Sequence, residues 1–414
     1  MKKKIILFEP EMLSANGHFL DNLIESTCLF KKKFQVLWFL NKNFNPEKNH
    51  IPKNITVKKI IESNIFKRKN NKFFYLVEEI GFFFTNILDI IFFLFFFIFR
   101  RKMFCFLGAL RSNYFVLPRY FKKFYLTYAK ERLNENDHIF FQSSRRKDLA
   151  LVSFITQIEK KFPKIHMRFF LPPTKRFKGS YFYLNKIKKL IKNKKIHLYS
   201  LGEYTKKTIE KNIMLKNSVE LSNLPYSFYN RPFKNKILNV GFLGEARINK
   251  GFHLIPNLIK LINQSGHRVN FLIQFSKASK EVIKYKEELI LLSKKYKNIK
   301  IIEKYCDYLE FRKLLEKIDI MPIMHDANQI NTITSGILYS SITYEIPSII
   351  PKKCNFMSDT LVNKSFEKYN NFSECVNKIK LISKNYSYYL KEAKKNSLVL
   401  KEKLNNDPLK KNFI

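Results

Sequence analysis

The chain has 414 residues, 45% of them hydrophobic, and a formal net charge of +43. This length and hydrophobic content indicate two folded domains and exclude a disordered chain. The charge is mostly lysine and is spread along the whole sequence. It therefore predicts no coherent nucleic-acid groove, and nucleic acid is not an expected partner, whereas an anionic donor or an anionic membrane surface is favoured.

The cysteines and the N-terminus indicate the cellular setting. No CxxC pair and no His cluster with metal-ligand spacing occurs, so reduced structural thiols and no metal are expected for Cys28, Cys105, Cys306, Cys354 and Cys375. The N-terminal MKKKIILFEP has an apolar run too short for a signal peptide, and it predicts a first strand. We expect a cytoplasmic protein, either free or peripheral on the inner face of the cytoplasmic membrane.

Short β-branched or aromatic runs alternate with amphipathic helical stretches, which is typical of a parallel α/β sheet. In the N-terminal half, strands are predicted at 2–10, 34–40, 55–60, 138–144, 164–172 and 195–201. In the C-terminal half, they are predicted at 236–244, 269–275, 299–305, 318–324 and 347–351. Helices are predicted between strands, for example at 251–266 and 308–318. Two α/β units thus follow one another.

A break in the periodicity separates these two units. Residues 221–236 contain two prolines and many polar side chains, which predicts a hinge-like linker. We expect an N-terminal, acceptor-side domain over 1–220 and a C-terminal domain over 237–385. The helical stretch over 386–414 either packs back across the junction or forms a solvated tail.

The segment 82–99 is almost entirely apolar and is followed by Arg100, Arg101 and Lys102. Its length approaches that of a membrane-spanning helix. Asn86 and Asp89 oppose a true span, because a carboxylate in hydrocarbon costs about 2.5–3.5 kcal/mol even by the lower scales. A helix on the membrane interface, a buried core helix and a true span all remain open. The basic, aromatic stretch over 104–130 fits the first interpretation or a solvated helical face.

The segment EARINKG follows the strand at 236–244 and carries Arg247 and Lys250. The carboxyl ends of parallel strands form the ligand-binding edge of open α/β sheets. Arg can bind two phosphate oxygens in a fork, and Lys adds a mobile charge. The pair therefore predicts a phosphate site, and a solvated loop is the alternative.

A second anion-binding element is predicted after the strand at 318–324. The loop HDANQINTIT leads into a helix opened by Thr334, Ser335 and Gly336. Free backbone N–H groups and the helix dipole favour an anion here, and Gly336 permits close approach of a phosphate. Alternatively, Ser335 is a simple helix N-cap.

The segments FLGEARINKGFHLIP, YLEFRKLLEKIDIMPIMHD and TSGILYSSITYEIPSIIP, in this order and spacing, resemble the donor domain of family 4 glycosyltransferases. The resemblance covers about residues 237–351 and is only architectural before them. It implies the GT-B fold, in which two Rossmann-like domains face each other across a cleft. It further implies that Arg247 and Lys250 bind the diphosphate of a UDP- or GDP-linked sugar, which is transferred with retention and without an essential metal. No DxD motif occurs in the setting used by metal-dependent transferases.

The residues predicted by this resemblance to bind the donor diphosphate or ribose are Gly17, Gly244, Arg247, Lys250, Thr334, Ser335, Gly336, Ile337 and Ser340. Two positions depart from the family pattern. Ser340 stands where a ribose-binding Glu is common, and Glu345 stands where Gly is usual. Ribose recognition is therefore expected to be altered, or the enzyme is degenerate.

The loop after the first predicted strand resembles the glycine-containing loop that faces the donor and acceptor in this family. Asn16, Gly17 and His18 are its candidates. Gly17 allows close backbone approach, and His18 is a candidate catalytic residue, as a base or a hydrogen-bond donor, together with Arg247 and Lys250. The alternative for His18 is an ordinary residue at a helix start. His166, within a strand, is expected to be structural.

Two functions follow from these observations. The first is a retaining glycosyltransferase that acts on a glycan or lipid-linked acceptor in bacterial surface polysaccharide or lipopolysaccharide synthesis. The alternative is a catalytically weak nucleotide-binding GT-B protein, a membrane-surface partner of another transferase. The sequence specifies neither sugar, base, acceptor nor linkage.

Overall fold

The structure is a computed structural model. It describes residues 2–9, 18–41, 44, 55–61, 124, 127–170, 172, 179–224, 227–232, 237–276, 278–326, 335–354, 361 and 364–413. Internal contacts divide the chain into two compact units. One comprises residues 1–15, 27–199 and 208–220, and the other comprises 16–26, 200–207 and 221–414.

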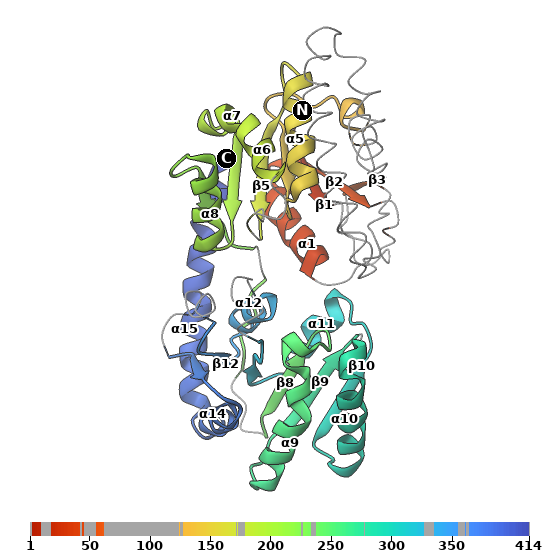
Figure 1. The fold of residues 1–414 in the computed structure, drawn as a ribbon, viewed down its shortest axis with the longest axis vertical. Helices are drawn as coiled ribbons and strands as arrows, with labels where there is room; N and C mark the ends of the chain where they lie inside the picture. Colours follow the sequence, from red (N-terminus) through yellow and green to blue (C-terminus); the bar gives the residue numbers. More distant parts are fainter. Residues whose placement is uncertain are drawn as a thin grey trace. The chain divides into compact units, whose positions relative to one another are not determined.

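The first unit is built on a seven-stranded sheet with the order β3-β2-β1-β4-β5-β6-β7 (Figure 1). Its strands are β1 (Lys3–Glu9), β2 (Phe34–Asn41), β3 (Thr56–Ile61), β4 (His138–Phe141), β5 (Lys164–Phe169), β6 (Ile196–Ser200) and β7 (Val219–Leu221). Its helices are α5 (Arg146–Ile158), α6 (Gly179–Lys186) and α7 (Lys188–Lys192), while α1 (His18–Phe30) and α8 (Glu203–Ile213) are each divided between the two units. β1 pairs in parallel with both β2 and β4, so the strand order reverses between β1 and β4, as in doubly wound sheets.

The two faces of this sheet differ in polarity. Alternation along β4, β5 and β6 directs Ile139, Ile165 and Leu198 into a hydrophobic core with α5. The intervening positions on the opposite face carry His138, His166, His197 and Tyr199. These three histidines, here called the histidine stack, come from three neighbouring strands.

The histidine stack is held by ring contacts and short polar contacts. His138 Nδ1 lies 3.0 Å from His166 Nε2, and His166 Nδ1 lies 3.0 Å from the Tyr199 hydroxyl. His166 stacks on His197 with ring centroids 4.9 Å apart. Burial, reinforced by Lys164, lowers the pKa of His138 to about 3 and of His197 to about 4. Burial also lowers the pKa of His166 well below 6.5, so the stack is neutral near pH 7.

The second unit contains two three-stranded sheets with the orders β10-β9-β8 and β11-β12-β13. Its strands are β8 (Asn239–Leu243), β9 (Asn270–Phe275), β10 (Ile299–Glu303), β11 (Met321–Pro322), β12 (Ser348–Pro351) and β13 (Phe366–Tyr369). A parallel bridge between Val240 and Ile320 joins the sheets, and Gly241 N donates to Ile320 O at 2.9 Å. The continuous order β10-β9-β8-β11-β12-β13 is doubly wound and reverses between β8 and β11.

Gly241 permits this junction. A Cβ at this position would lie 2.3 Å from Ile318 Cδ1, closer than nonbonded carbons approach. β8 can therefore approach the segment that leads into β11 only because residue 241 has no side chain.

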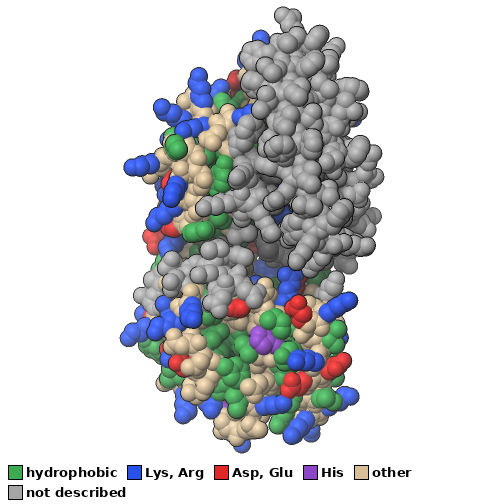
Figure 2. Space-filling view, viewed as in Figure 1, with side chains coloured by type: hydrophobic (Ala, Val, Ile, Leu, Met, Phe, Trp, Pro, Cys, Tyr) green, Lys and Arg blue, Asp and Glu red, His purple; other side chains and the backbone are tan. Residues whose placement is uncertain are grey.

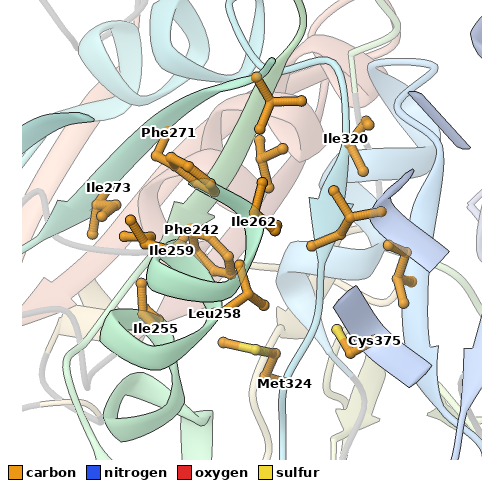
Figure 3. Packing of buried hydrophobic residues seen from close by; sticks show 14 of the residues in the cluster. Phe242, Ile255, Leu258, Ile259, Ile262, Phe271, Ile273, Ile320, Met324 and Cys375 are labelled. Carbon is orange, nitrogen blue, oxygen red and sulfur yellow. The ribbon is translucent and has the colours of Figure 1, made fainter. Parts of the chain in front are cut away.

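Helices cover both faces of the second unit's sheet. They are α9 (Ile255–Gln264), α10 (Ile283–Lys295), α11 (Tyr308–Leu315), α12 (Gly336–Thr343), α14 (Phe372–Lys384), α15 (Tyr386–Asn405) and α16 (Pro408–Asn412), with 3-10 turns η3 (Ile248–Lys250), η4 (Phe252–Leu254) and η5 (Lys280–Val282). One core combines Leu258 and Ile262 of α9 with Phe242 of β8 and Cys375 of α14 (Figure 3). A second core lies among α11, α12 and α15. The result is a three-layer α/β unit.

The surface charge and the lengths of the apolar helices are relevant to whether the protein contacts a membrane. On the face in Figure 2, Lys and Arg side chains are scattered over both units rather than gathered in one patch. Within the described parts of the chain, no helix is long and apolar enough to cross a membrane. The segment 82–99 lies outside the described residues, so the three interpretations of it stay predictions.

Candidate functional site

The loop after β8 carries Arg247 and Lys250 at the carboxyl edge of the second unit's sheet. Arg247 precedes the 3-10 turn η3, and Lys250 ends that turn. Glu245 forms an ion pair with Arg247, and the side chains of both are about half exposed (51% and 52%). Such exposed pairs contribute at most about 1 kcal/mol, so an incoming phosphate can displace Glu245 from the guanidinium.

Lys250 has an environment that disfavours its own charge. Loss of hydration lowers the pKa of Lys250, and Arg247 lowers it further, whereas Glu245 opposes the change. A bound anion would stabilise the charged ammonium. The structure thus places Arg247 and Lys250 on one short turn, and their predicted role in binding a diphosphate stays a prediction.

The loops after β8 and β11 run side by side. Asp326 N donates to Asn249 O at 3.0 Å. Gly251 has a φ of +76°, and a Cβ there would lie 2.1 Å from Met324 O. The buried Met324 side chain itself packs in the core beside Leu258 of α9 (Figure 3). Residues on either side of this contact are therefore fixed relative to one another.

The loop after β9 joins the same edge. Ala246 and Ala278 form a parallel bridge, and Ser279 N donates to Ala246 O at 3.1 Å. Gly244 N donates to Gln274 O at 3.1 Å. Three successive strand ends thus support the segment that carries Arg247 and Lys250.

Several buried polar atoms at this edge make no hydrogen bond within the described part of the chain. They include Asn249 Oδ1, Ser279 Oγ, His325 Nδ1 and Ser335 Oγ. His325 is 7% exposed and Ser335 is 3% exposed. A buried polar atom left unpaired costs about 1–3 kcal/mol, so several of them near one edge indicate a place where a polar ligand can supply the partners.

The α12 helix begins at this edge with Gly336. Ser335 occupies the N-cap position in an extended conformation, but its hydroxyl makes no capping hydrogen bond. A Cβ added at exposed Gly336 would meet no atom within 4 Å. Ile337 is half-buried, and Thr334 lies outside the described residues. An open helix start can accept an anion, and the predicted anion site and the simple N-cap both stay predictions.

Two departures from the family pattern have local structural roles. Ser340 Oγ donates to Gly336 O at 3.1 Å within α12. Glu345 follows α12 with a φ of +54°, a conformation that glycine adopts more easily. Its carboxylate accepts a hydrogen bond from Arg231 N at 2.8 Å. Glu345 therefore links the end of α12 to the segment before β8 through a hydrogen bond.

Arg231 is fully buried and completes this anchor. Its guanidinium donates to Leu315 O at 2.8 Å and to Tyr344 O at 3.0 Å, and it pairs with Asp319 at 3.3 Å. Asp319 Oδ2 also accepts from Asn239 N of β8 at 2.9 Å. The anchor thus connects residue 231 to the strands that position the site.

Most of the N-terminal candidate residues cannot be placed in the site. Asn16 and Gly17 lie outside the described residues. His18 is the first residue of α1, but its side chain is not described. Their predicted roles stay predictions.

Asn249 and His325 are candidate site residues that the sequence analysis did not single out. Asn249 lies inside the quoted EARINKG motif, and His325 directly follows a predicted strand at the ligand edge. Their positions after predicted strands, at the edge where ligands bind, were the sequence signal that could have identified them. Within the described ranges, no group of three or more His, Cys, Asp or Glu could hold a metal ion, and the expectation of metal-free activity stays a prediction.

Comparison with known proteins supports the fold. No protein-family model and no curated protein matches the chain. Among solved structures, sucrose-phosphate synthase from Thermosynechococcus elongatus is similar, with a TM-score of 0.59, 10% identity, and coverage of 96% of this chain and 93% of that one. Anabaena HepE in complex with UDP has a TM-score of 0.59 and 10% identity over 97% and 95% of the chains. WaaG, a glycosyltransferase involved in lipopolysaccharide biosynthesis, has a TM-score of 0.55 and 9% identity, with coverage of 99% of this chain and 97% of that one. The chain therefore has the α/β fold of GT-B glycosyltransferases, with two Rossmann-like domains.

Proposed function

We propose that this protein is a glycosyltransferase that binds a nucleotide-sugar diphosphate at the edge formed by Arg247, Lys250 and the start of α12. The observation that carries the proposal is the convergence of two cations and an open helix start at joined strand ends. The UDP bound to Anabaena HepE and the UDP-2-fluoro glucose bound to an E. coli trehalose-6-phosphate protein support a UDP-linked donor.

In the proposed reaction, the bond between the anomeric carbon and the β-phosphate oxygen breaks. A hydroxyl oxygen of the acceptor forms the new bond, and its proton leaves with the nucleoside diphosphate or a nearby base. Negative charge increases on the departing diphosphate, so Arg247 and Lys250 stabilise the transition state more than the bound donor. The amides at Ser335 and Gly336 add partial positive charge.

The finer features of this function are proposals from the resemblance. We propose transfer of a hexose with retention, without an essential metal, to a glycan or lipid-linked acceptor. WaaG, with its part in lipopolysaccharide biosynthesis, supports a role in bacterial surface glycans. A place on the inner face of the cytoplasmic membrane follows from such an acceptor, and His18 is the proposed catalytic group of the N-terminal loop.

A catalytically weak binding protein is the second candidate. The observation that favours it is Ser340, whose hydroxyl is engaged by Gly336 O within α12, at a position where the resemblance implies a carboxylate. In that case the site binds nucleotide but serves as a membrane-surface partner of another transferase.

The test is a turnover screen with UDP- and GDP-hexoses and a membrane-extract acceptor, in which nucleoside diphosphate release and glycan product are both measured. Arg247→Ala and Lys250→Ala should abolish transfer while the circular dichroism spectrum is retained. Lys300→Ala, at an exposed position of β10, is the matched control and should transfer normally. Normal turnover in both site variants contradicts the proposal. Saturable binding without transfer by the wild type supports the weak binding protein instead.

A further inference from the structure

His325 is buried at the same sheet edge as the predicted phosphate site. It follows β11, one residue before Asp326, whose N–H is bonded to Asn249 O. Its Nδ1 atom is buried and makes no hydrogen bond to any described residue. The charge of Lys250 acts on the imidazole, so the two side chains lie near one another. His325 thus belongs to the same edge but presents a different chemistry.

The His325 imidazole is uncharged at physiological pH. Burial, together with the charge of Lys250, lowers the pKa of His325 to about 3. A neutral imidazole adds no positive charge for a phosphate. It offers one donor nitrogen and one acceptor nitrogen.

Asn249 adds a second uncharged group beside it. The Oδ1 atom of Asn249 is buried and lacks a hydrogen-bond partner among the described residues. An amide oxygen only accepts hydrogen bonds, and it repels the oxygens of a fully ionised phosphate. A hydroxyl group, by contrast, both donates and accepts, so it can satisfy Asn249 Oδ1 and His325 Nδ1.

We propose that His325 and Asn249 form a hydroxyl-binding subsite for the donor, next to the cations that bind its diphosphate. This inference rests on the proposed function. The hydroxyls come from either of two parts of a nucleotide sugar, the ribose or the transferred hexose. Arg247 and Lys250 then fix the diphosphate, and the uncharged pair selects what is attached to it.

Calorimetry with three probes separates these parts: inorganic pyrophosphate, UDP and UDP-glucose, with GDP and GDP-mannose as a parallel series. His325→Leu removes the imidazole nitrogens at similar volume. It should lower the affinity for the hydroxyl-bearing probe about fivefold, the equivalent of one net hydrogen bond, and leave the affinity for pyrophosphate unchanged. A loss already seen with UDP assigns the subsite to ribose, and a loss seen only with the sugar conjugate assigns it to the hexose.

Two further variants make the test independent of folding defects. His325→Asn retains an amide near the Nδ1 position and should recover most of the affinity. Asn249→Ala keeps the backbone oxygen that binds Asp326 N and should repeat the pattern of His325→Leu. The control is His267→Leu, at a half-buried histidine between α9 and β9, which should bind every probe as the wild type does.

The outcomes separate this inference from the proposed function. Equal losses for pyrophosphate and for the hydroxyl-bearing probes overturn the inference, because His325 would then act through the diphosphate site. Unchanged affinity for every probe in both His325→Leu and Asn249→Ala also overturns it. A wild-type protein that binds no probe in either series contradicts the proposed function itself.

Discussion

Replacement of Gly251 by alanine tests whether the contact between the loops after β8 and β11 builds the site. Gly251 has a φ of +76°, and an added Cβ would lie 2.1 Å from Met324 O. Alanine in the left-handed region costs about 1–2 kcal/mol. The clash must also move the loops apart, and loss of the bond from Asp326 N to Asn249 O costs about 1 kcal/mol more. We expect a total loss of about 2–3 kcal/mol.

Gly266 provides the matched control. Its φ is +67°, and no atom lies within 4 Å of an added Cβ. Gly266→Ala should therefore show the left-handed cost alone, about 1–2 kcal/mol, with normal ligand binding. Urea unfolding measures both free energies, and calorimetry with UDP and GDP measures binding. Gly251→Ala should be the less stable variant and should bind nucleotide at least about tenfold more weakly, because Lys250 and Asn249 move away from His325.

Equal destabilisation of the two glycine variants would refute this reasoning. Normal nucleotide affinity in a folded Gly251→Ala protein would refute it as well.

Three further predictions concern stability and the helix start. Lowering the pH from 7 to 5 should destabilise the first unit by about 2 kcal/mol per member of the histidine stack. The reason is that the unfolded chain exposes imidazoles that take up protons below pH 6.5, whereas the folded protein keeps them neutral. Urea unfolding should show full stability above pH 6.5 and a decline below it, and the free energy of unfolding should fall less steeply with pH in His197→Gln. Arg231→Met leaves the buried Asp319 carboxylate without its ion-pair partner and should cost about 3–5 kcal/mol by urea unfolding, with part recovered in Arg231→Met/Asp319→Asn. Ser335→Ala should raise stability, since it removes a buried hydroxyl that has no partner among the described residues, but weaken UDP or GDP binding about fivefold in calorimetry.

The fold could be predicted because its strands carry strong local signals. Continuous apolar runs such as ILF in β1 and FLIQF in β9 are typical of strands buried on both faces. β7 and β13 were missed because VEL and FEKY are short and carry charged residues between their apolar ones. Such strands depend on pairing with a neighbour, which a local pattern does not contain.

The cations of the site were predictable, but its uncharged groups were not. Arg247 and Lys250 stand in a motif after a strand, whereas His325 gains its character from burial and from the nearby charge of Lys250. Glu345 shows the same limit. Its position suggested altered ribose recognition, which stays a prediction, and its contact with Arg231 N, more than a hundred residues away, adds a structural role that the sequence did not indicate. Both properties arise from tertiary contacts rather than from local sequence.

The most direct test of the central claim is calorimetric titration of UDP and GDP into the wild type, Lys250→Met and Lys300→Met. Each variant removes one positive charge, but only Lys250 lies at the proposed diphosphate site. One charge-assisted contact contributes about 1.5–3 kcal/mol, so Lys250→Met should bind about 10- to 100-fold more weakly, while Lys300→Met should match the wild type. Equal affinities for all three proteins, or equal losses in both variants, would contradict the account.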